Sequence, residues 1–170
     1  MILTQEELNA PIPGAPNFTL AELIRSNTAT QRGISNTPTD PEIITNLQTL
    51  AREALQPCRN ALGPVVVNSG LRLPILNTAI GGSSTSWHCF GKAADIKVPS
   101  RSLWDVFCWF HDNVPCVELI AEELPYGWIH VAYSADHSGP TNTKYKLGGG
   151  PVKKASFDDI KKIFKQQGLI

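Results

Sequence analysis

The sequence predicts an α+β fold in which helices flank a small antiparallel sheet. Apolar residues at helical spacing alternate along the chain with short β-branched or apolar runs that are typical of strands. The last two predicted strands, 117–122 and 128–133, are joined by a tight turn and form a hairpin. A hairpin favours an antiparallel sheet over a doubly wound parallel one. The chain has 170 residues, and a domain averages about 150, so we expect a single domain.

The first predicted elements precede the sheet. Residues 1–17 contain three prolines and are expected to form an irregular leader. Thr19 is suited to cap a short helix at about 20–26, because its hydroxyl can accept a backbone N–H of the first turn. Pro41 suits the first position of a longer amphipathic helix. Pro57 is expected to kink or interrupt this helix, because proline lacks an N–H.

The rest of the chain mixes strands and helices. Predicted strands lie at 65–67, 93–98, 117–122 and 128–133, and predicted helices at 74–80, 100–112 and 155–170. Ser100 is expected to cap the second of these helices. Residues 134–154 are rich in Gly, Ser, Thr and Lys, which indicates a long loop. Residues 18–133 would then be the core of a single domain spanning 1–170.

Composition excludes several classes of protein. Lys plus Arg number 15 and Asp plus Glu number 15, so the formal net charge is zero, which argues against a nucleic-acid partner. No apolar run approaches the roughly 20 residues of a membrane helix, so we expect no membrane insertion. The N-terminus lacks the pattern of a secretory signal peptide, and we expect synthesis in the cytoplasm. The four cysteines form no CxxC pair, which fits a reducing compartment and not a zinc ribbon: Cys58, Cys89, Cys108 and Cys116.

The densest polar cluster runs from Ser86 to Asp95 and includes His88, and a further histidine, His130, stands on the second hairpin strand. Histidine and aspartate are good zinc ligands. Gly91 allows the chain to double back between His88 and Asp95, so that both side chains can face one point. His130 could reach the same point if its strand pairs into the same sheet. Three protein ligands would leave a fourth position for water, which is the catalytic arrangement.

These motifs resemble a known family. The pattern SxHxxGxAxD at 86–95, followed by WxH at 128–130, is similar to the zinc site of the M15 peptidases, which include D-Ala-D-Ala carboxypeptidases, dipeptidases and many phage lysins. The stretch SGLRxPxLN at 69–77 is similar to the segment that precedes this site. Two N-terminal stretches, at 18–24 and 28–34, are similar to one bacterial and phage branch. The resemblance spans about residues 17–133 and implies a Hedgehog/DD-peptidase-like fold.

The resemblance also implies roles for individual residues. His88, Asp95 and His130 would be the zinc ligands. Arg72 would grip a substrate carboxylate, or charge developing on the scissile carbonyl, through two hydrogen bonds. Ser86 would hydrogen-bond the substrate or orient its loop. The implied substrate is the peptide of bacterial peptidoglycan, and a chain without a signal peptide would suit a phage lysin or a virion-associated enzyme.

The acid that activates water departs from the common family pattern. In several branches this acid stands three residues before the last histidine, but here that position is Gly127. Glu122 and Glu123 are the nearest candidates. A three-residue hairpin loop, 125–127, would place Glu122 opposite His130, whereas a two-residue loop would shift the register by one. We predict Glu122 as the general base and keep Glu123 in reserve.

Two other classes of function remain open. A non-catalytic domain could keep the zinc and lack hydrolysis, and the absence of an acid at position 127 keeps this class open. A structural domain of a virion could use the same cleft to bind cell-wall peptide. The sequence does not decide which bond would be cut, whether D-Ala-D-Ala, L-Ala-D-Glu or a cross-link, and so leaves carboxypeptidase and endopeptidase activity both open.

Overall fold

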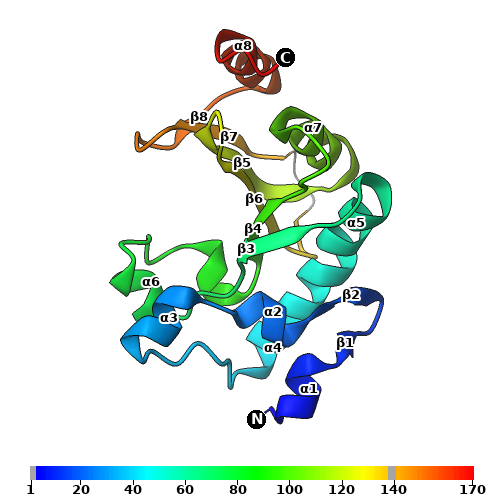
Figure 1. Ribbon diagram of the computed structural model, residues 1–170, viewed down its shortest axis with the longest axis vertical. Helices are drawn as coiled ribbons and strands as arrows, with labels where there is room; N and C mark the ends of the chain where they lie inside the picture. Colours follow the sequence, from blue (N-terminus) through cyan, green and yellow to red (C-terminus); the bar gives the residue numbers. More distant parts are fainter. Residues whose placement is uncertain (1–2, 138–140) are drawn as a thin grey trace.

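The computed structural model describes residues 3–137 and 141–170, and a six-stranded sheet lies at its centre (Figure 1). The strand order is β3-β4-β6-β5-β7-β8, and neighbouring strands are antiparallel except for β5 and β7. The strands are β3 (Val66–Ser69), β4 (Ala93–Lys97), β5 (Cys116–Leu124), β6 (Trp128–Tyr133), β7 (Thr143–Leu147) and β8 (Lys153–Lys154). The predicted α+β class, with a largely antiparallel sheet and flanking helices, is confirmed.

The N-terminal region is more regular than predicted. It contains α1 (Gln5–Asn9), the β1 (Pro11–Ile12) and β2 (Ala15–Thr19) hairpin, α2 (Leu20–Ile24), α3 (Asn27–Arg32), α4 (Pro41–Leu50), η1 (Ala51–Leu55) and α5 (Gln56–Leu62). The irregular leader predicted for 1–17 is therefore wrong: Thr4 caps α1 through a capping box, and the following prolines fall in a short hairpin. The predicted interruption at Pro57 is confirmed, because η1 is a wider π-helical turn just before it.

Two predictions in the second half also need correction. The helix α7 (Leu103–Asn113) is capped by Ser102, with Asp105 completing the capping box, and not by Ser100. The Ser100 hydroxyl instead donates to the Leu62 carbonyl. The segment 134–154 is not one long loop, since β7 and β8 lie within it and extend the sheet. The remaining helices are α6 (Pro74–Ala79), η2 (Trp87–Phe90) and α8 (Phe157–Gln166).

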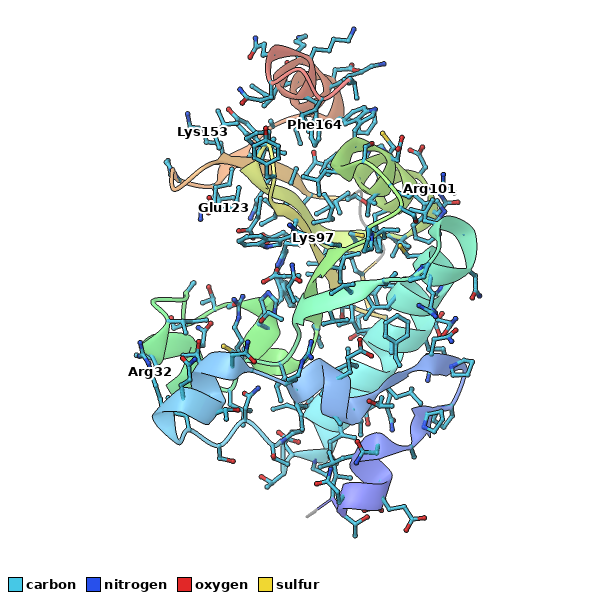
Figure 2. All side chains as sticks on the ribbon, in the orientation of Figure 1. Arg32, Lys97, Arg101, Glu123, Lys153 and Phe164 are labelled. Carbon is cyan, nitrogen blue, oxygen red and sulfur yellow. The ribbon has the colours of Figure 1, made fainter. Side chains whose placement is uncertain are left out.

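The two faces of the sheet differ because successive strand residues point to opposite sides. One face packs against α7 and α8, and aromatic rings such as Trp104, Phe107 and Phe164 meet there. Figure 2 labels Phe164, which lies between α8 and the sheet. The opposite face bears polar residues, including Asp95 and His130. None of the helices within the described ranges is long and apolar enough to cross a membrane.

Candidate metal centre

Local structure brings the three predicted ligands to one point. His88 lies on η2, whose last turn ends at Gly91 in the left-handed conformation, with φ of 68°. A Cβ at Gly91 would lie 2.8 Å from the Ile43 carbonyl oxygen, so both the backbone angle and the close packing require glycine. The chain then enters β4, where Asp95 pairs directly with His130 of β6. Directly paired residues share a face, so Asp95 and His130 meet, and the turn at Gly91 brings His88 to them.

The ligand atoms are close together and shielded from solvent. The Oδ1 atom of Asp95 lies 3.2 Å from Nε2 of His88 and 2.9 Å from Nδ1 of His130, and these two nitrogens are 3.1 Å apart. All three residues are buried. Tetrahedral zinc with bonds of about 2.0–2.1 Å separates its ligand atoms by about 3.3 Å. Within the described residues, this is the group of His, Cys, Asp and Glu side chains whose spacing suits a metal ion.

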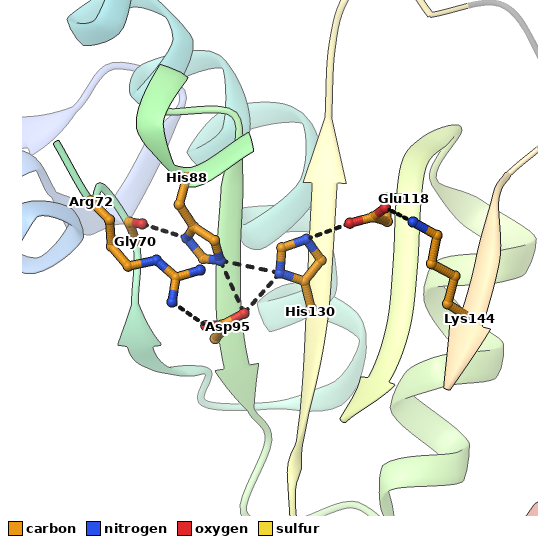
Figure 3. A network of polar contacts seen from close by, with 7 residues as sticks. All are labelled: Gly70, Arg72, His88, Asp95, Glu118, His130 and Lys144. Carbon is orange, nitrogen blue, oxygen red and sulfur yellow. Dashed lines mark hydrogen bonds and ion pairs between the residues drawn. The ribbon is translucent and has the colours of Figure 1, made fainter. Parts of the chain in front are cut away.

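Hydrogen bonding shows that a cation fits this group (Figure 3). The Nδ1 atom of His88 lies 2.6 Å from the carbonyl oxygen of Gly70. A carbonyl only accepts, so Nδ1 carries the hydrogen, and the Nε2 of neutral His88 directs a lone pair at the Asp95 carboxylate. Two buried acceptors that face each other are unfavourable unless a positive charge lies between them. The donor set therefore suits a metal ion.

Gly70 is the residue that makes this orientation possible. Its backbone passes so close to α2 that a Cβ would lie 2.2 Å from the Leu23 carbonyl oxygen. The neighbouring N–H of Leu71 donates to that same oxygen at 2.7 Å. Glycine is thus needed to hold this strand end against α2, with the Gly70 carbonyl beneath His88.

On the opposite side of the group, His130 faces an acid that sequence reasoning missed. Its Nε2 lies 3.4 Å from Oε1 of Glu118, longer than an ordinary hydrogen bond, and has no closer partner within the described residues. The other oxygen of Glu118 forms an ion pair with Lys144 of β7. One signal was available: Glu118 lies four residues before Glu122, so both occupy the same face of a strand. Lys144 lies within 134–154, whose composition predicts a loop and gives no sign of a strand.

The charges of the group favour cation binding. Burial lowers the pKa of His88, which keeps this ring neutral. Burial alone would raise the pKa of Asp95, but His88 and His130 hold it well below its usual range. Burial would also lower the pKa of His130, but Asp95 and Glu118 raise it to about 9. A metal must therefore displace a proton from His130, as is common for histidine ligands.

The hairpin register differs from the predicted one. Ile120, and not Glu122, pairs with His130, while Glu122 pairs with Trp128. The predicted pairing was wrong because the connection is longer than three residues. The displacement is two residues, however, and an even displacement keeps a side chain on its face. Glu122 therefore still lies on the metal-binding face, where burial, followed by the charge of Asp95, raises its pKa.

The neighbouring acid is held elsewhere. Glu123 has a positive φ of 53°, and one of its carboxylate oxygens accepts the N–H of Gly149 at 2.7 Å. Its other oxygen forms an ion pair with Lys146, and this lysine lowers the pKa of Glu123. Glu123 is thus bound to the β7 end of the sheet.

The structure also explains why no acid stands at position 127. A Cβ on Gly127 would lie 1.6 Å from the carbonyl oxygen of Glu122. The main chain of Glu122 occupies the space that any side chain at 127 would need. The hairpin therefore excludes any side chain, and so an acid, at position 127.

Arg72 lies next to the metal group. Its Nη1 is 3.7 Å from Oδ2 of Asp95, and its backbone N–H donates to the His88 carbonyl. Its Nε is buried and has no hydrogen-bond partner within the described ranges. Arg72 also lines a polar cavity of about 350 Å³, together with Arg25 and Ser69. Ser86 stands immediately before η2, and its predicted role in substrate binding stays a prediction.

Comparison with known proteins identifies a family and a curated relative. The family model described as "Peptidase M15" matches residues 16–132. The "Zinc D-Ala-D-Ala carboxypeptidase" of Streptomyces albus G is 38% identical over 87 residues. That match covers 50% of this chain but only 32% of the relative. The family match includes His88, Asp95 and His130 and ends before Lys144.

Proposed function

Because the chain belongs to the peptidase M15 family, we propose that it is a zinc peptidase that hydrolyses an amide bond in the peptide of bacterial peptidoglycan. The observation that carries this proposal is the buried group formed by His88, Asp95 and His130, whose ligand atoms lie 2.9–3.2 Å apart. The name of the curated relative supports both the metal and the substrate class. When bound, zinc supplies Lewis acidity toward a water molecule and a substrate carbonyl.

Glu122 is the general base of this proposal. It takes a proton from the attacking water and passes it to the leaving amine. Its position on the face of Asp95 and His130 gives it access to the reacting groups. Its raised pKa suits a group that must both accept and release a proton. Glu123 is unsuited to this role, because Lys146 and Gly149 hold both of its oxygens.

Arg72 and the adjoining cavity bind the substrate. A guanidinium grips a carboxylate through two parallel hydrogen bonds, and the Nε of Arg72 has no partner within the described chain. Arg25 lines the same cavity and adds a second positive charge. A cavity of about 350 Å³ with this lining suits a short, negatively charged peptide segment. Ser86, two residues before His88, adds a hydrogen bond to the substrate.

The finer form of the proposal is a lysin-like enzyme, encoded by a phage or carried in a virion, that acts on the cell wall as a carboxypeptidase or an endopeptidase. Mass spectrometry of muropeptides before and after incubation tests whether the protein hydrolyses this peptide and which bond it cuts. Loss of a terminal residue would identify a carboxypeptidase, and separation of cross-linked peptides an endopeptidase. The Glu122→Gln variant is the matched control. No mass change with zinc-loaded wild-type protein would contradict hydrolysis.

A second candidate is a zinc-binding module without hydrolytic activity, whether or not it is part of a virion. The observation that favours it is Gly127, which replaces the acid that several family branches use. Such a module would bind cell-wall peptide with the same affinity in the wild type and in Glu122→Gln. An enzyme would show turnover that Glu122→Gln abolishes. Binding and turnover measured on the same peptide therefore separate the two functions.

A further inference from the structure

We propose that Glu118 and Lys144 form a positioning pair that fixes His130 as a metal ligand, a role that rests on the proposed zinc site. Glu118 lies on β5, two residues before the partner of His130, and therefore on the same face of the sheet. Its Oε1 faces the His130 nitrogen that points away from Asp95. Its Oε2 is held by Lys144 (Figure 3).

The chemistry of the imidazole explains what Glu118 does. A neutral ring has one N–H and one lone pair, and only the lone pair can bind a metal. A carboxylate accepts but does not donate, so Glu118 requires the hydrogen on Nε2. The lone pair then lies on Nδ1, which faces His88 and Asp95. A carboxylate behind a histidine ligand also orients the ring and makes it more basic.

The two histidines are supported in different ways. His88 is oriented by the main-chain carbonyl of Gly70, at 2.6 Å. His130 is oriented by a side chain, and that side chain is itself free to rotate unless something holds it. Lys144 provides this restraint from β7, which runs parallel to β5. The site thus depends on a strand beyond residues 16–132, the part that the family model matches.

A second pair on the same strands provides a natural control. Glu123 of β5 and Lys146 of β7 also form an ion pair. This pair lies at the other end of the strands, and the second oxygen of Glu123 accepts a hydrogen bond from the Gly149 N–H. It therefore has the same chemical composition as the Glu118–Lys144 pair but no histidine to orient.

The test is the zinc dissociation constant, measured by competition with a chromophoric chelator. Glu118→Ala should weaken zinc binding by about 10- to 100-fold, the usual cost of losing such an outer partner. Glu118→Gln keeps an acceptor oxygen and should recover part of this loss. Lys144→Met should weaken binding less than Glu118→Ala. Lys146→Met and Glu123→Gln should leave the zinc affinity at the wild-type value.

A proton resonance gives an independent readout. In the zinc-loaded protein, the Nε2 proton of His130 should appear far downfield and exchange slowly, because Glu118 accepts it. Glu118→Ala should remove this resonance, and a purely structural role for Glu118 would leave it in place. If Glu118→Ala does not fold, the comparison of Lys144→Met with Lys146→Met decides, since both lysines are partly exposed.

The outcomes separate this inference from the proposed function. Wild-type zinc affinity and an unchanged Nε2 resonance in the Glu118 variants would overturn the inference while the zinc site stands. Equal effects of Lys144→Met and Lys146→Met would overturn the role of Lys144. A wild-type protein that binds no zinc would overturn both the site and the inference. Loss of hydrolysis alone would leave the inference untouched, because neither readout requires turnover.

Discussion

The two faces of the six-stranded sheet are made by alternating residues of the same strands, but one face buries apolar side chains and the other buries polar ones. On one face, Leu119, Ile129 and Val131 are completely buried against apolar neighbours. On the other, Asp95 and His130 are also buried, yet their polar atoms face one another. The first face gains stability from burial, and the second incurs a cost that a bound cation would offset. The alternation of side chains along the strands therefore places the residues that stabilise the fold and those of the candidate site on different faces.

The largest effect expected on the polar face is loss of the metal. His88→Ala and His130→Ala each remove one of three ligands and should lose most of the zinc, about one ion per chain in the wild type. Atomic absorption of the purified variants measures this. Circular dichroism should show that the fold is retained, because the apolar face is unchanged. Full zinc content in both variants would contradict the site assignment.

A smaller but specific effect is expected at the general base. Glu122→Gln should keep zinc and fold and should lose a factor of roughly 10² to 10⁴ in rate, the usual contribution of general acid–base catalysis. Glu123→Gln should cleave at nearly the wild-type rate, because Lys146 and Gly149 hold that carboxylate away. Both rates should be measured on one wall-peptide substrate. Activity in Glu122→Gln together with inactivity in Glu123→Gln would reverse the assignment.

A substitution on the apolar face should lower the stability of the fold and leave the zinc content unchanged. Phe107 is completely buried and its ring centroid lies 6.2 Å from that of Phe164. Phe107→Ala should lower the free energy of unfolding by about 3–5 kcal/mol, because it leaves a cavity. At temperatures where the variant remains folded, its zinc content should equal that of the wild type. Denaturant unfolding and zinc analysis check the two statements, and loss of zinc from folded protein would show that the faces are coupled.

These contrasts indicate how much the sequence could predict. The grouping of His88, Asp95 and His130 was predictable because their spacing resembles a specific family motif, and Gly91 because the chain must reverse between two of them. The hairpin register was not predictable, because the sequence does not reveal that the connection spans 123–127 and not 125–127. The contact of Lys144 with Glu118 was not predictable. Lys144 lies on a short strand with alternating lysines, and the glycines and serines around it have the composition of a loop.

The polar face should also make the zinc-free protein sensitive to pH. Burial would raise the pKa of Glu118, but His130 and Lys144 lower it to about 2 from an ordinary value of 4.5. Its contribution to stability is thus complete above 4.5 and is lost as the pH falls toward 2. The pKa of His130 is raised from 6.5 to about 9, so its contribution is complete below 6.5 and is lost as the pH rises through 9.

Chemical denaturation of zinc-free protein across this range should therefore show the contribution of Glu118 disappearing as the pH falls from 4.5 toward 2, and that of His130 disappearing as the pH rises from 6.5 through 9. Glu118→Gln should flatten the acid side of the profile, whereas Glu53→Gln, at an exposed position beside Arg52, should leave it unchanged. A profile that is the same with and without the Glu118 carboxylate would show that this contact contributes nothing to the folded state.

The smallest effect on zinc content is expected from modification of the cysteines, because none of them belongs to the proposed metal centre. Burial raises the pKa of Cys58 and Cys116 to about 12, and burial also raises the pKa of Cys89, next to the ligand His88. Thiols react as thiolates, so these groups should resist iodoacetamide at neutral pH. The metal-binding group found within the described residues contains no cysteine. Mass spectrometry should show slow modification, mainly at the less buried Cys108, with the zinc content unchanged. Zinc released in proportion to modification of Cys89 would contradict this expectation and would implicate that thiol in the metal centre.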